Sequence, residues 1–292
     1  MGADLAYVFT AQEAAPAIKA YSPELMITPV YSAGDLADSG EVAQQQLLAA
    51  VSQVLPKLHS LLLGPGMGRD PNVLQAAADI VPRAVLWNLP VVLDADSIVM
   101  VVENPGAVRG IPNVVLTPNA NEFRLLCERM ERDIAGRETN PSMEGVAVRG
   151  VAKKQEDGFP GKDLESKVAA VERVAVYLDG VIVVLKGKVD IISNGSRTIV
   201  CAVPGGLKRC GGIGDVLSGA MATSLAWVSL QQSDGQEVEE LRLWAVWWAC
   251  AVTRHASRRG YEAHGRAMSA TNVYENIGGV MEDVVPSPAA GS

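Results

Sequence analysis

Short, continuous runs of valine, isoleucine and leucine most constrain what this chain of 292 residues can fold into. Four such runs, each followed by a segment with helical periodicity, lie at residues 61–63, 90–93, 114–116 and 181–185. Strands that are apolar throughout, rather than at every second residue, are covered on both faces, as in a parallel sheet. The sequence therefore predicts an α/β fold with a mostly parallel central sheet flanked by helices.

Each of these runs ends in a polar or glycine-rich turn, and the turns lie at residues 64–70, 94–96, 117–119 and 186–190. Ligands of open α/β sheets bind just beyond the carboxyl ends of the strands. We therefore expect the four turns to share one rim and to form the ligand site.

Helix starts are signalled by capping patterns. Thr10 and Asn119 are each followed three residues later by a glutamate, and Asp70 is followed by a proline. A cap residue with a glutamate at the third position, or with a proline at the first, is typical of a helix N-terminus. We expect helices to begin after these three residues.

The stretch from Pro204 to Asp215 is rich in glycine and runs directly into a segment with a helical pattern. Glycines let backbone N–H groups turn toward one point, and the start of a helix adds the positive end of its dipole. Such a segment suits a phosphoryl group. Asp215 at its end is either a helix cap or a base that takes a proton from a hydroxyl, and the two roles are compatible.

The charge of the chain limits its partners. The formal net charge of −8 disfavours binding to nucleic acid or to acidic membrane surfaces. Cationic residues nevertheless gather beside the glycine-rich segments, namely Arg69, Lys186, Lys188, Lys208 and Arg209. This arrangement favours a small anionic ligand.

Several common site types are excluded by spacing. No Walker A sequence, no Gly-x-Gly-x-x-Gly after a first strand and no Gly-x-Ser-x-Gly elbow is found, and the three histidines lack metal-ligand or triad spacing. The four cysteines form no CxxC pair, which indicates a reducing compartment. The remaining candidate is phosphoryl chemistry.

The chain is expected to form one domain over residues 1–285, with a flexible insertion near 131–165 and a disordered tail over 286–292. No secretory signal or apolar run long enough to span a bilayer is visible, so we expect a soluble, cytoplasmic protein, or a mitochondrial form if an N-terminal segment is missing. Trp244, Trp247 and Trp248 share one helix face, which is either core or the interface of a homo-oligomer.

A series of motifs carries a family resemblance. In chain order the motifs are Ala3-Asp4-Leu5 with Tyr21-Ser22-Pro23-Glu24-Leu25, Gly64-Pro65-Gly66-Met67-Gly68-Arg69-Asp70, Asp94-Ala95-Asp96, Leu116-Thr117-Pro118-Asn119 with Glu122-Phe123, Lys186-Gly187 with Asp190, and Lys208-Arg209-Cys210-Gly211-Gly212 with Gly214-Asp215. In this order and spacing, the sequence resembles the ATP-dependent NAD(P)H-hydrate dehydratases of the ribokinase-like superfamily, in their eukaryotic form. The resemblance implies a three-layer ribokinase-like fold.

The resemblance also implies a reaction. ATP phosphorylates the hydroxyl of the hydrated nicotinamide ring of NADHX or NADPHX, and phosphate is then eliminated to restore NADH or NADPH. Asp215 is the implied base near the hydrated ring, and ATP and Mg²⁺ are the implied cofactors. The ligand-binding residues that the motifs imply are Lys186, Gly187, Lys188, Val189, Asp190, Gly205, Gly206, Leu207, Lys208, Arg209, Cys210, Gly211, Gly212, Ile213 and Gly214 for ATP, and Gly68, Asn119, Ala120, Asn121, Glu122, Phe123, Arg124, Leu125 and Asp215 for NAD(P)HX.

One departure from the family concerns the N-terminus. Members of the family carry a strand and a glycine-rich turn before the Ala3-Asp4-Leu5 segment, and this chain begins after them. We therefore expect a sheet without that first strand and a substrate pocket without one wall. Two alternatives stay open at this stage: a ribokinase-like kinase of a small alcohol such as a vitamin precursor, and a catalytically impaired form that only binds nucleotide.

Overall fold

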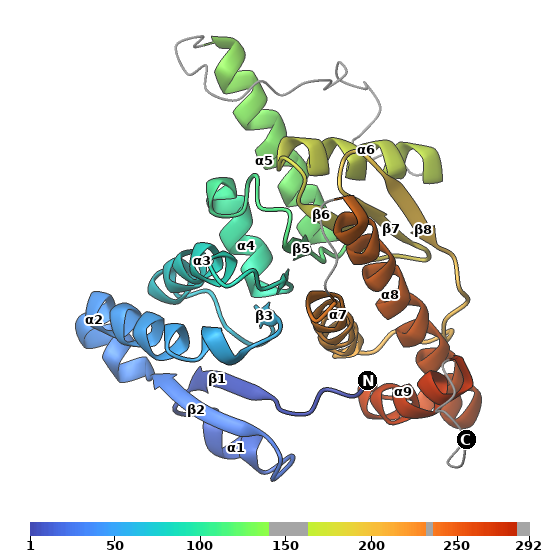
Figure 1. Cartoon of the computed structure of the whole chain (residues 1–292), viewed down its shortest axis with the longest axis horizontal. Coiled ribbons are helices and arrows are strands. Elements are labelled where there is room, and N and C mark those ends of the chain that lie inside the picture. Colours follow the sequence, from blue (N-terminus) through green and yellow to red (C-terminus); the bar gives the residue numbers. More distant parts are fainter. Residues whose placement is uncertain (140–162, 232–235, 285–292) are drawn as a thin grey trace.

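The structure is a computed structural model that describes residues 1–139, 163–231 and 236–284 (Figure 1). The tail over 286–292 and residues 140–162 of the expected insertion lie outside the described residues. Residues 131–139, which were expected to belong to the insertion, continue a helix instead. Salt bridges between side chains four residues apart, Arg124 with Glu128 and Arg129 with Asp133, support this helix.

The central sheet has six strands in the order β3-β4-β5-β6-β7-β8. Their bounds are Leu61–Leu63 for β3, Val91–Leu93 for β4, Val114–Leu116 for β5, Ile182–Leu185 for β6, Asp190–Ser193 for β7 and Thr198–Cys201 for β8. Strands β3 to β6 run parallel to one another, and β7 and β8 continue the sheet as antiparallel strands. The four apolar runs are thus the four parallel strands, and the predicted mostly parallel sheet is confirmed.

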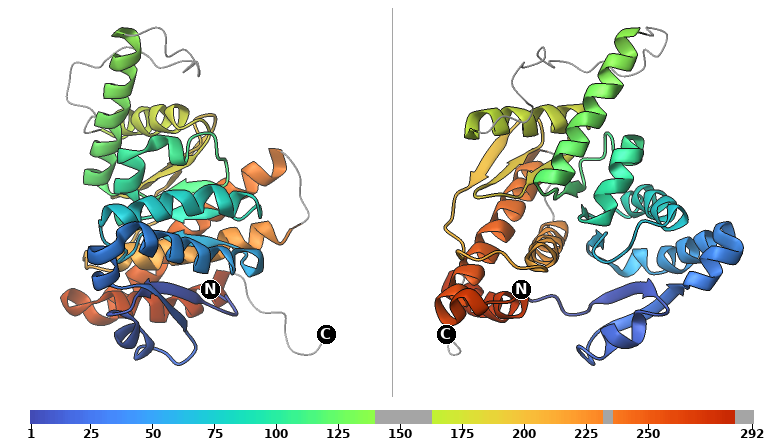
Figure 2. Two further views of the ribbon diagram at one scale, coloured as in Figure 1. Left: turned by 90° about the vertical axis from the view of Figure 1, so that its left-hand side faces the viewer. Right: turned by 180° about the vertical axis from the view of Figure 1, so that it is seen from behind.

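Helices cover both faces of this sheet, so the molecule has three layers (Figure 2). Val91 and Leu93 of β4 face one core, and Val92 between them faces the other. The first core also contains residues of α3 (Pro71–Val85), α4 (Asp96–Glu103), α5 (Ala120–Thr139) and α6 (Leu164–Tyr177). The second core contains residues of α7 (Ile213–Ser229) and α8 (Gln236–His264). Two apolar faces explain why these strands are apolar at every position.

The N-terminal part forms a second, smaller sheet, in which β1 (Tyr7–Ala11) pairs in parallel with β2 (Met26–Tyr31). This pair lies apart from β3, which is an edge strand of the six-stranded sheet (Figure 1). The prediction that a helix begins after Thr10 is wrong, because Thr10 pairs with Pro29 inside this sheet. The described residues also contain α1 (Ala15–Lys19), α2 (Ala33–Ser52), α9 (Ala270–Val284) and the 3₁₀ turns η1 (Leu55–Lys57), η2 (Pro105–Ala107) and η4 (Gly265–Ala267).

The other two predicted helix starts are confirmed. Asp70 caps α3 by accepting hydrogen bonds from the backbone of Asn72 and Val73, and Pro71 is the first helical residue. At α5, Asn119 Oδ1 accepts from Glu122 N at 3.1 Å, and Glu122 Oε2 accepts from Asn119 N at 2.8 Å. This reciprocal capping box fixes the point at which the chain leaves β5.

The C-terminal helices pack on each other, and the tryptophan face of α8 is divided between core and solvent. Trp247 packs against the second core and donates to Val200 O at 3.2 Å, whereas Trp244 is 44% exposed.

Within the described parts of the chain, no helix is both long and apolar enough to cross a membrane.

Candidate functional site

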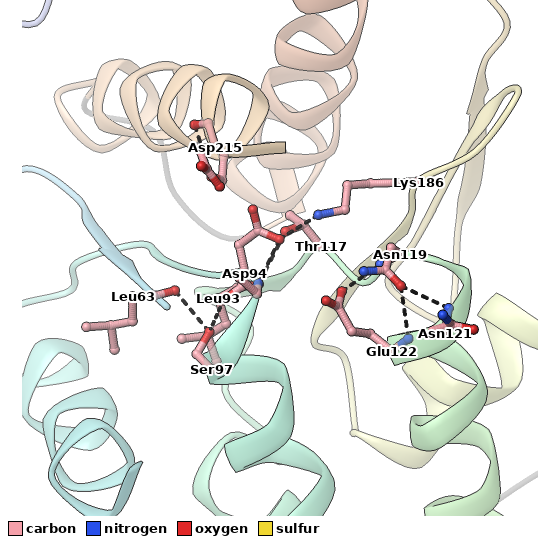
Figure 3. A network of polar contacts seen from close by, with 12 residues as sticks. Leu63, Leu93, Asp94, Ser97, Thr117, Asn119, Asn121, Glu122, Lys186 and Asp215 are labelled. Carbon is pink, nitrogen blue, oxygen red and sulfur yellow. Dashed lines mark hydrogen bonds and ion pairs between the residues drawn. The ribbon is translucent and has the colours of Figure 1, made fainter. Parts of the chain in front are cut away.

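The turns that follow the four parallel strands meet at one rim, as predicted. Hydrogen bonds join each turn to its neighbour: Ser97 Oγ donates to Leu63 O at 2.9 Å, Thr117 N donates to Leu93 O at 3.0 Å, and Lys186 N donates to Pro118 O at 3.1 Å. Figure 3 shows these turns converging on Asp94, with Asp215 on α7 across from them. The rim therefore brings together side chains that are far apart in the sequence.

A buried ion pair lies at the centre of the rim. Asp94 follows β4 directly, and its Oδ1 accepts from Lys186 Nζ at 2.5 Å. The side chains are 2% and 19% exposed, respectively. Lys186 was expected at an ATP site, whereas Asp94 was recognised only as part of a motif. A buried carboxylate requires a partner because losing its hydration is costly.

Asp215 is the third residue of α7. The helix begins at Ile213, and its N-cap is Gly212 at φ +87°, so the alternative that Asp215 is the N-cap is wrong. Asp215 remains accessible to solvent, and its carboxyl group lies toward Asp94 (Figure 3). Partial burial raises the pKa of Asp215, the charge of Asp94 raises it further, and Lys186 lowers it. A carboxylate with a raised pKa accepts a proton more readily than an ordinary aspartate does.

The glycine-rich segment before α7 is shaped by close backbone contacts. A Cβ at Gly206 would lie 2.5 Å from the carbonyl oxygen of Ser257, and one at Gly212 would lie 2.9 Å from Ala270 Cβ. These glycines therefore let the segment fit tightly against α8 and α9. The first N–H groups of α7 have no partner within the helix, as at every helix N-terminus, and they suit an anion.

Arg254 on α8 is a residue that the sequence analysis missed. Its Nε pairs with Asp190 Oδ2 at 2.6 Å, and the two side chains are 13% and 7% exposed. Its Nη groups donate to the carbonyl oxygens of Gly187 and Lys188, both at 2.9 Å, and to that of Val203 at 3.3 Å. Arg254 thus fastens the turn after β6 to the start of the glycine-rich segment. The available signal was an arginine two residues beyond the apolar run at residues 243–252.

The other cations near the glycine-rich segment differ in how they are held. Lys208 Nζ donates to Met268 O at 2.7 Å, which ties the segment to the turn before α9. Lys188 and Arg209 are exposed, and Leu207, which directly precedes Lys208, is 86% exposed. Cys210 packs against the small core between α8 and α9. Lys188 and Arg209 are therefore placed to meet an anion from solvent.

Residues expected on the NAD(P)HX side follow β3 and β5, the two strands on either side of β4. Gly68 N donates to Asp96 Oδ2 at 3.0 Å, and Arg69 pairs with the same carboxylate at 3.0 Å. Asn119 and Glu122 form the capping box of α5, so their side chains already serve the helix. Residues 120 and 121 belong to the exposed or half-buried first turn of α5.

Farther along α5, the residues predicted to bind NAD(P)HX differ in how exposed their side chains are. Phe123 is fully buried in the first core, Arg124 pairs with Glu128, and Leu125 is 37% exposed. The side chain of Phe123 thus serves packing, and the exposed members of the segment are the ones placed to meet a ligand. Val189 is half-buried and also packs against the first core.

The described residues contain no group of three or more histidines, cysteines, aspartates or glutamates that could hold a metal ion. A cage made entirely of protein ligands is therefore not part of the described rim. Mg²⁺ commonly binds through one or two carboxylates together with substrate phosphates, and this mode remains compatible with the rim.

Solved structures share this fold. A ribokinase-like superfamily protein from Enterococcus faecalis superimposes with a TM-score of 0.60 at 17% sequence identity, over 97% of this chain and 78% of that one. Hydroxyethylthiazole kinase from Pyrococcus horikoshii gives a TM-score of 0.55 at 14% identity, over 95% of this chain and 90% of that one. The predicted fold class is confirmed: this is a ribokinase-like α/β protein.

Sequence comparison identifies the family to which the chain belongs within this fold class. The family model described as NAD(P)H-hydrate dehydratase matches residues 1–278. The ATP-dependent (S)-NAD(P)H-hydrate dehydratases of Emericella nidulans and Bos taurus are 35% and 36% identical to this chain, each over 95% of it, and the matches cover 79% and 73% of those proteins. The human protein of the same name is 34% identical over 95% of this chain and 69% of its own length. The chain belongs to the NAD(P)H-hydrate dehydratase family.

Proposed function

We propose that this protein is an enzyme that uses ATP to dehydrate NADHX and NADPHX to NADH and NADPH. The observation that carries the proposal is the placement of Asp215 in the first turn of α7, beside the Asp94–Lys186 pair and at the end of a tightly fitted glycine segment. Membership of the dehydratase family supports the same conclusion.

Asp215 acts as the base in the first step. The hydroxyl of the hydrated ring attacks the γ-phosphorus of ATP, Asp215 takes the hydroxyl proton, and the bond to the β-phosphate oxygen breaks to release ADP. The phosphate then leaves the ring as a ring C–H bond gives up its proton, which restores the carbon–carbon double bond. Overall, ATP and NADHX yield ADP, phosphate, NADH and one proton.

The protein's part in phosphoryl transfer is positioning and charge stabilisation. Residues 186–190 and 205–214 lie around the ATP phosphates in this proposal, and the backbone amides at the start of α7 face the transferred group. Lys186 and the exposed Lys188 and Arg209 offset the phosphate charge. Mg²⁺ bound together with ATP would supply further charge neutralisation.

The hydrated nicotinamide nucleotide extends in this proposal along the turns after β3 and β5, near Gly68 and residues 119–125, with its ring at Asp215. The turn after β3 is held there by Asp96, which accepts from Gly68 N. Cytoplasmic location, a homo-oligomeric state and a single domain over residues 1–285 stay predictions from the sequence.

A direct assay tests the proposal. The protein is mixed with ATP, Mg²⁺ and NADHX or NADPHX, and the absorbance of the reduced nicotinamide is followed together with ADP. We expect one ADP for each reduced nicotinamide formed. ADP formation that depends on a different alcohol, with no recovery of the reduced nicotinamide, would instead identify a kinase. Stabilisation by ATP and Mg²⁺ against heat without turnover would identify a nucleotide-binding protein.

A further inference from the structure

Asp94 has no part in the chemistry proposed above, yet the rim is built around it. Its carboxylate accepts from Lys186 Nζ at 2.5 Å and from Ala95 N at 2.9 Å, and its side chain is 2% exposed. A carboxylate buried to this degree is not placed to receive a proton from a ligand. Its contacts are with protein groups, and the most consequential of them is the Lys186 ammonium.

The turn that holds Asp94 is under unusual constraint. Ala95 adopts a positive φ of 51°, which residues other than glycine rarely do. Gly64 packs so closely that a Cβ there would lie 1.7 Å from Asp94 O, and Ser97 Oγ donates to that oxygen at 2.8 Å. Strained backbone of this kind concentrates where a side chain must be held in one position. Here that side chain is the Asp94 carboxylate.

Gly214 connects the ion pair to the catalytic helix. A Cβ at Gly214 would lie 3.6 Å from Lys186 Nζ and 3.8 Å from Asp94 Oδ2. The pair therefore lies close to the backbone of Gly214, the residue that directly precedes Asp215. Both charges act on Asp215 from this position, one from the end of β4 and the other from the turn after β6.

We propose that Asp94 is a positioning residue that holds the Lys186 ammonium beside Gly214 and, together with it, controls how readily the Asp215 carboxylate takes up a proton. This inference rests on the proposed function for its catalytic meaning, but not for its geometry. An ammonium group has three N–H donors, and the ion pair uses one. The Lys186 side chain is 19% exposed, and in this proposal its remaining donors meet a phosphoryl oxygen.

The two charges of the pair act on Asp215 in opposite directions. Partial burial raises the pKa of Asp215, Asp94 raises it further, and Lys186 lowers it. Asp94 and Lys186 are the charged groups that act on the Asp215 carboxyl in the described part of the chain. Removing the Asp94 charge alone should therefore lower the pKa of Asp215, and removing the Lys186 charge alone should raise it. A purely structural role of the pair would not produce opposite shifts.

The test follows the Asp215 carboxyl carbon by NMR in protein labelled with ¹³C at the aspartate carboxyl groups. The resonance is assigned by its loss in Asp215→Asn. For Asp94→Asn we expect the midpoint to fall, because a negative charge near Asp215 has been removed. For Lys186→Met we expect it to rise. The double variant Asp94→Asn/Lys186→Met removes both charges, and its midpoint should return toward that of the wild type.

Asp79→Asn is the matched control, because Asp79 is a carboxylate of α3 that accepts from Gln44 and Gln75 and takes no part in the rim. It should leave the midpoint unchanged. If loss of Lys186 prevents folding, Asp94→Asn and the double variant still decide the question. An unchanged or raised midpoint in Asp94→Asn, or a shift of both single variants in the same direction, would overturn the inference.

The pH profile of kcat/KM provides a second readout. In Asp94→Asn the acid limb should move to lower pH by the same amount as the NMR midpoint. If wild-type protein forms no NADH from ATP and NADHX while the NMR midpoints shift as expected, the proposed function fails and the role of the pair stands. If wild-type protein is active and the midpoints do not shift, the inference about Asp94 fails.

Discussion

The two ends of the rim are held by ion pairs of very different kinds. The turn after β6 is fixed by two buried pairs, Lys186 with Asp94 and Arg254 with Asp190, in which no side chain is more than 19% exposed. The turn after β3 is held by Arg69 and Asp96, whose side chains are 69% and 22% exposed. Water screens an exposed pair, whereas breaking a buried pair leaves a charge without compensation. The protein therefore fixes one end of the site far more firmly than the other.

The firmly fixed end is the one that we propose for ATP. Phosphoryl transfer depends on reacting groups that are already in position, because ordering them during the reaction would add to the barrier. At the β3 end, the weaker attachment leaves the turn near Gly68 able to adjust to a large dinucleotide. The division between a fixed end and an adjustable end can be tested variant by variant.

The largest effect on stability is expected for Arg254→Met. The change leaves the buried Asp190 without its charged partner, and a broken buried pair costs about 3–5 kcal/mol of unfolding free energy. Urea denaturation measures the loss. Arg258→Met is the matched control on the same helix, because Arg258 pairs with Glu262 and both side chains are more than half exposed. Similar losses in the two variants would remove the distinction between buried and exposed pairs.

A smaller effect is expected for Gly206→Ala. The new Cβ would meet the carbonyl oxygen of Ser257 at 2.5 Å, and overpacking of this kind costs about 1–3 kcal/mol. Because the displaced backbone belongs to the proposed ATP segment, KM for ATP should rise more than KM for NADHX. Gly205→Ala is the control, since its nearest neighbour, Arg254 Cγ, would lie at an ordinary 3.7 Å. Equal effects of the two changes would contradict this account of the segment.

Arg69→Met tests the loosely held end. Loss of this exposed pair should change the unfolding free energy by about 1 kcal/mol or less. KM for NADHX should rise while KM for ATP stays close to that of the wild type, because Asp96 also holds Gly68. Steady-state kinetics with each substrate varied in turn checks this. A loss of stability as large as that of Arg254→Met would show that the two ends of the rim are held equally firmly.

The smallest effect concerns the stability of Asp215→Asn. Because the pKa of Asp215 is raised in the folded protein, its ionisation disfavours folding, and stability falls as the pH rises from the ordinary aspartate value through the raised one. At neutral pH the asparagine variant should therefore unfold at a slightly higher temperature than the wild type. Below the ordinary aspartate pKa the two should melt together. A variant that is less stable at neutral pH would show that the sign is wrong.

The central sheet could be predicted from the sequence because its signal is local. Runs such as 61–63 and 114–116 are apolar at every position, and each ends in a turn that the rim uses. The β7–β8 hairpin and the β1–β2 pair were not predicted. Strand β2 contains Pro29, and pairing with a distant segment, rather than local pattern, decides whether such residues form a strand.

The backbone segments of the site were predicted from the sequence, but two of the charged side chains that pair within it, Asp94 and Arg254, were missed. The glycine segment and Asp215 stand next to each other in the chain, so their pattern was visible. Asp94 lies 92 residues from Lys186, and Arg254 lies 64 residues from Asp190. Only the folded chain brings such pairs together, and no spacing rule in a single sequence indicates them. A buried charge needs a partner, but the sequence does not say which residue that partner is.

The rate of Asp215→Asn tests whether Asp215 takes the proton from the hydroxyl of the hydrated ring. The variant is assayed with ATP, Mg²⁺ and NADHX, and its stabilisation by ATP is measured on the same preparation. We expect kcat to fall by at least about a hundredfold while ATP still stabilises the fold, because only the base has been removed. Turnover at the wild-type rate would contradict the assignment of Asp215 as the base.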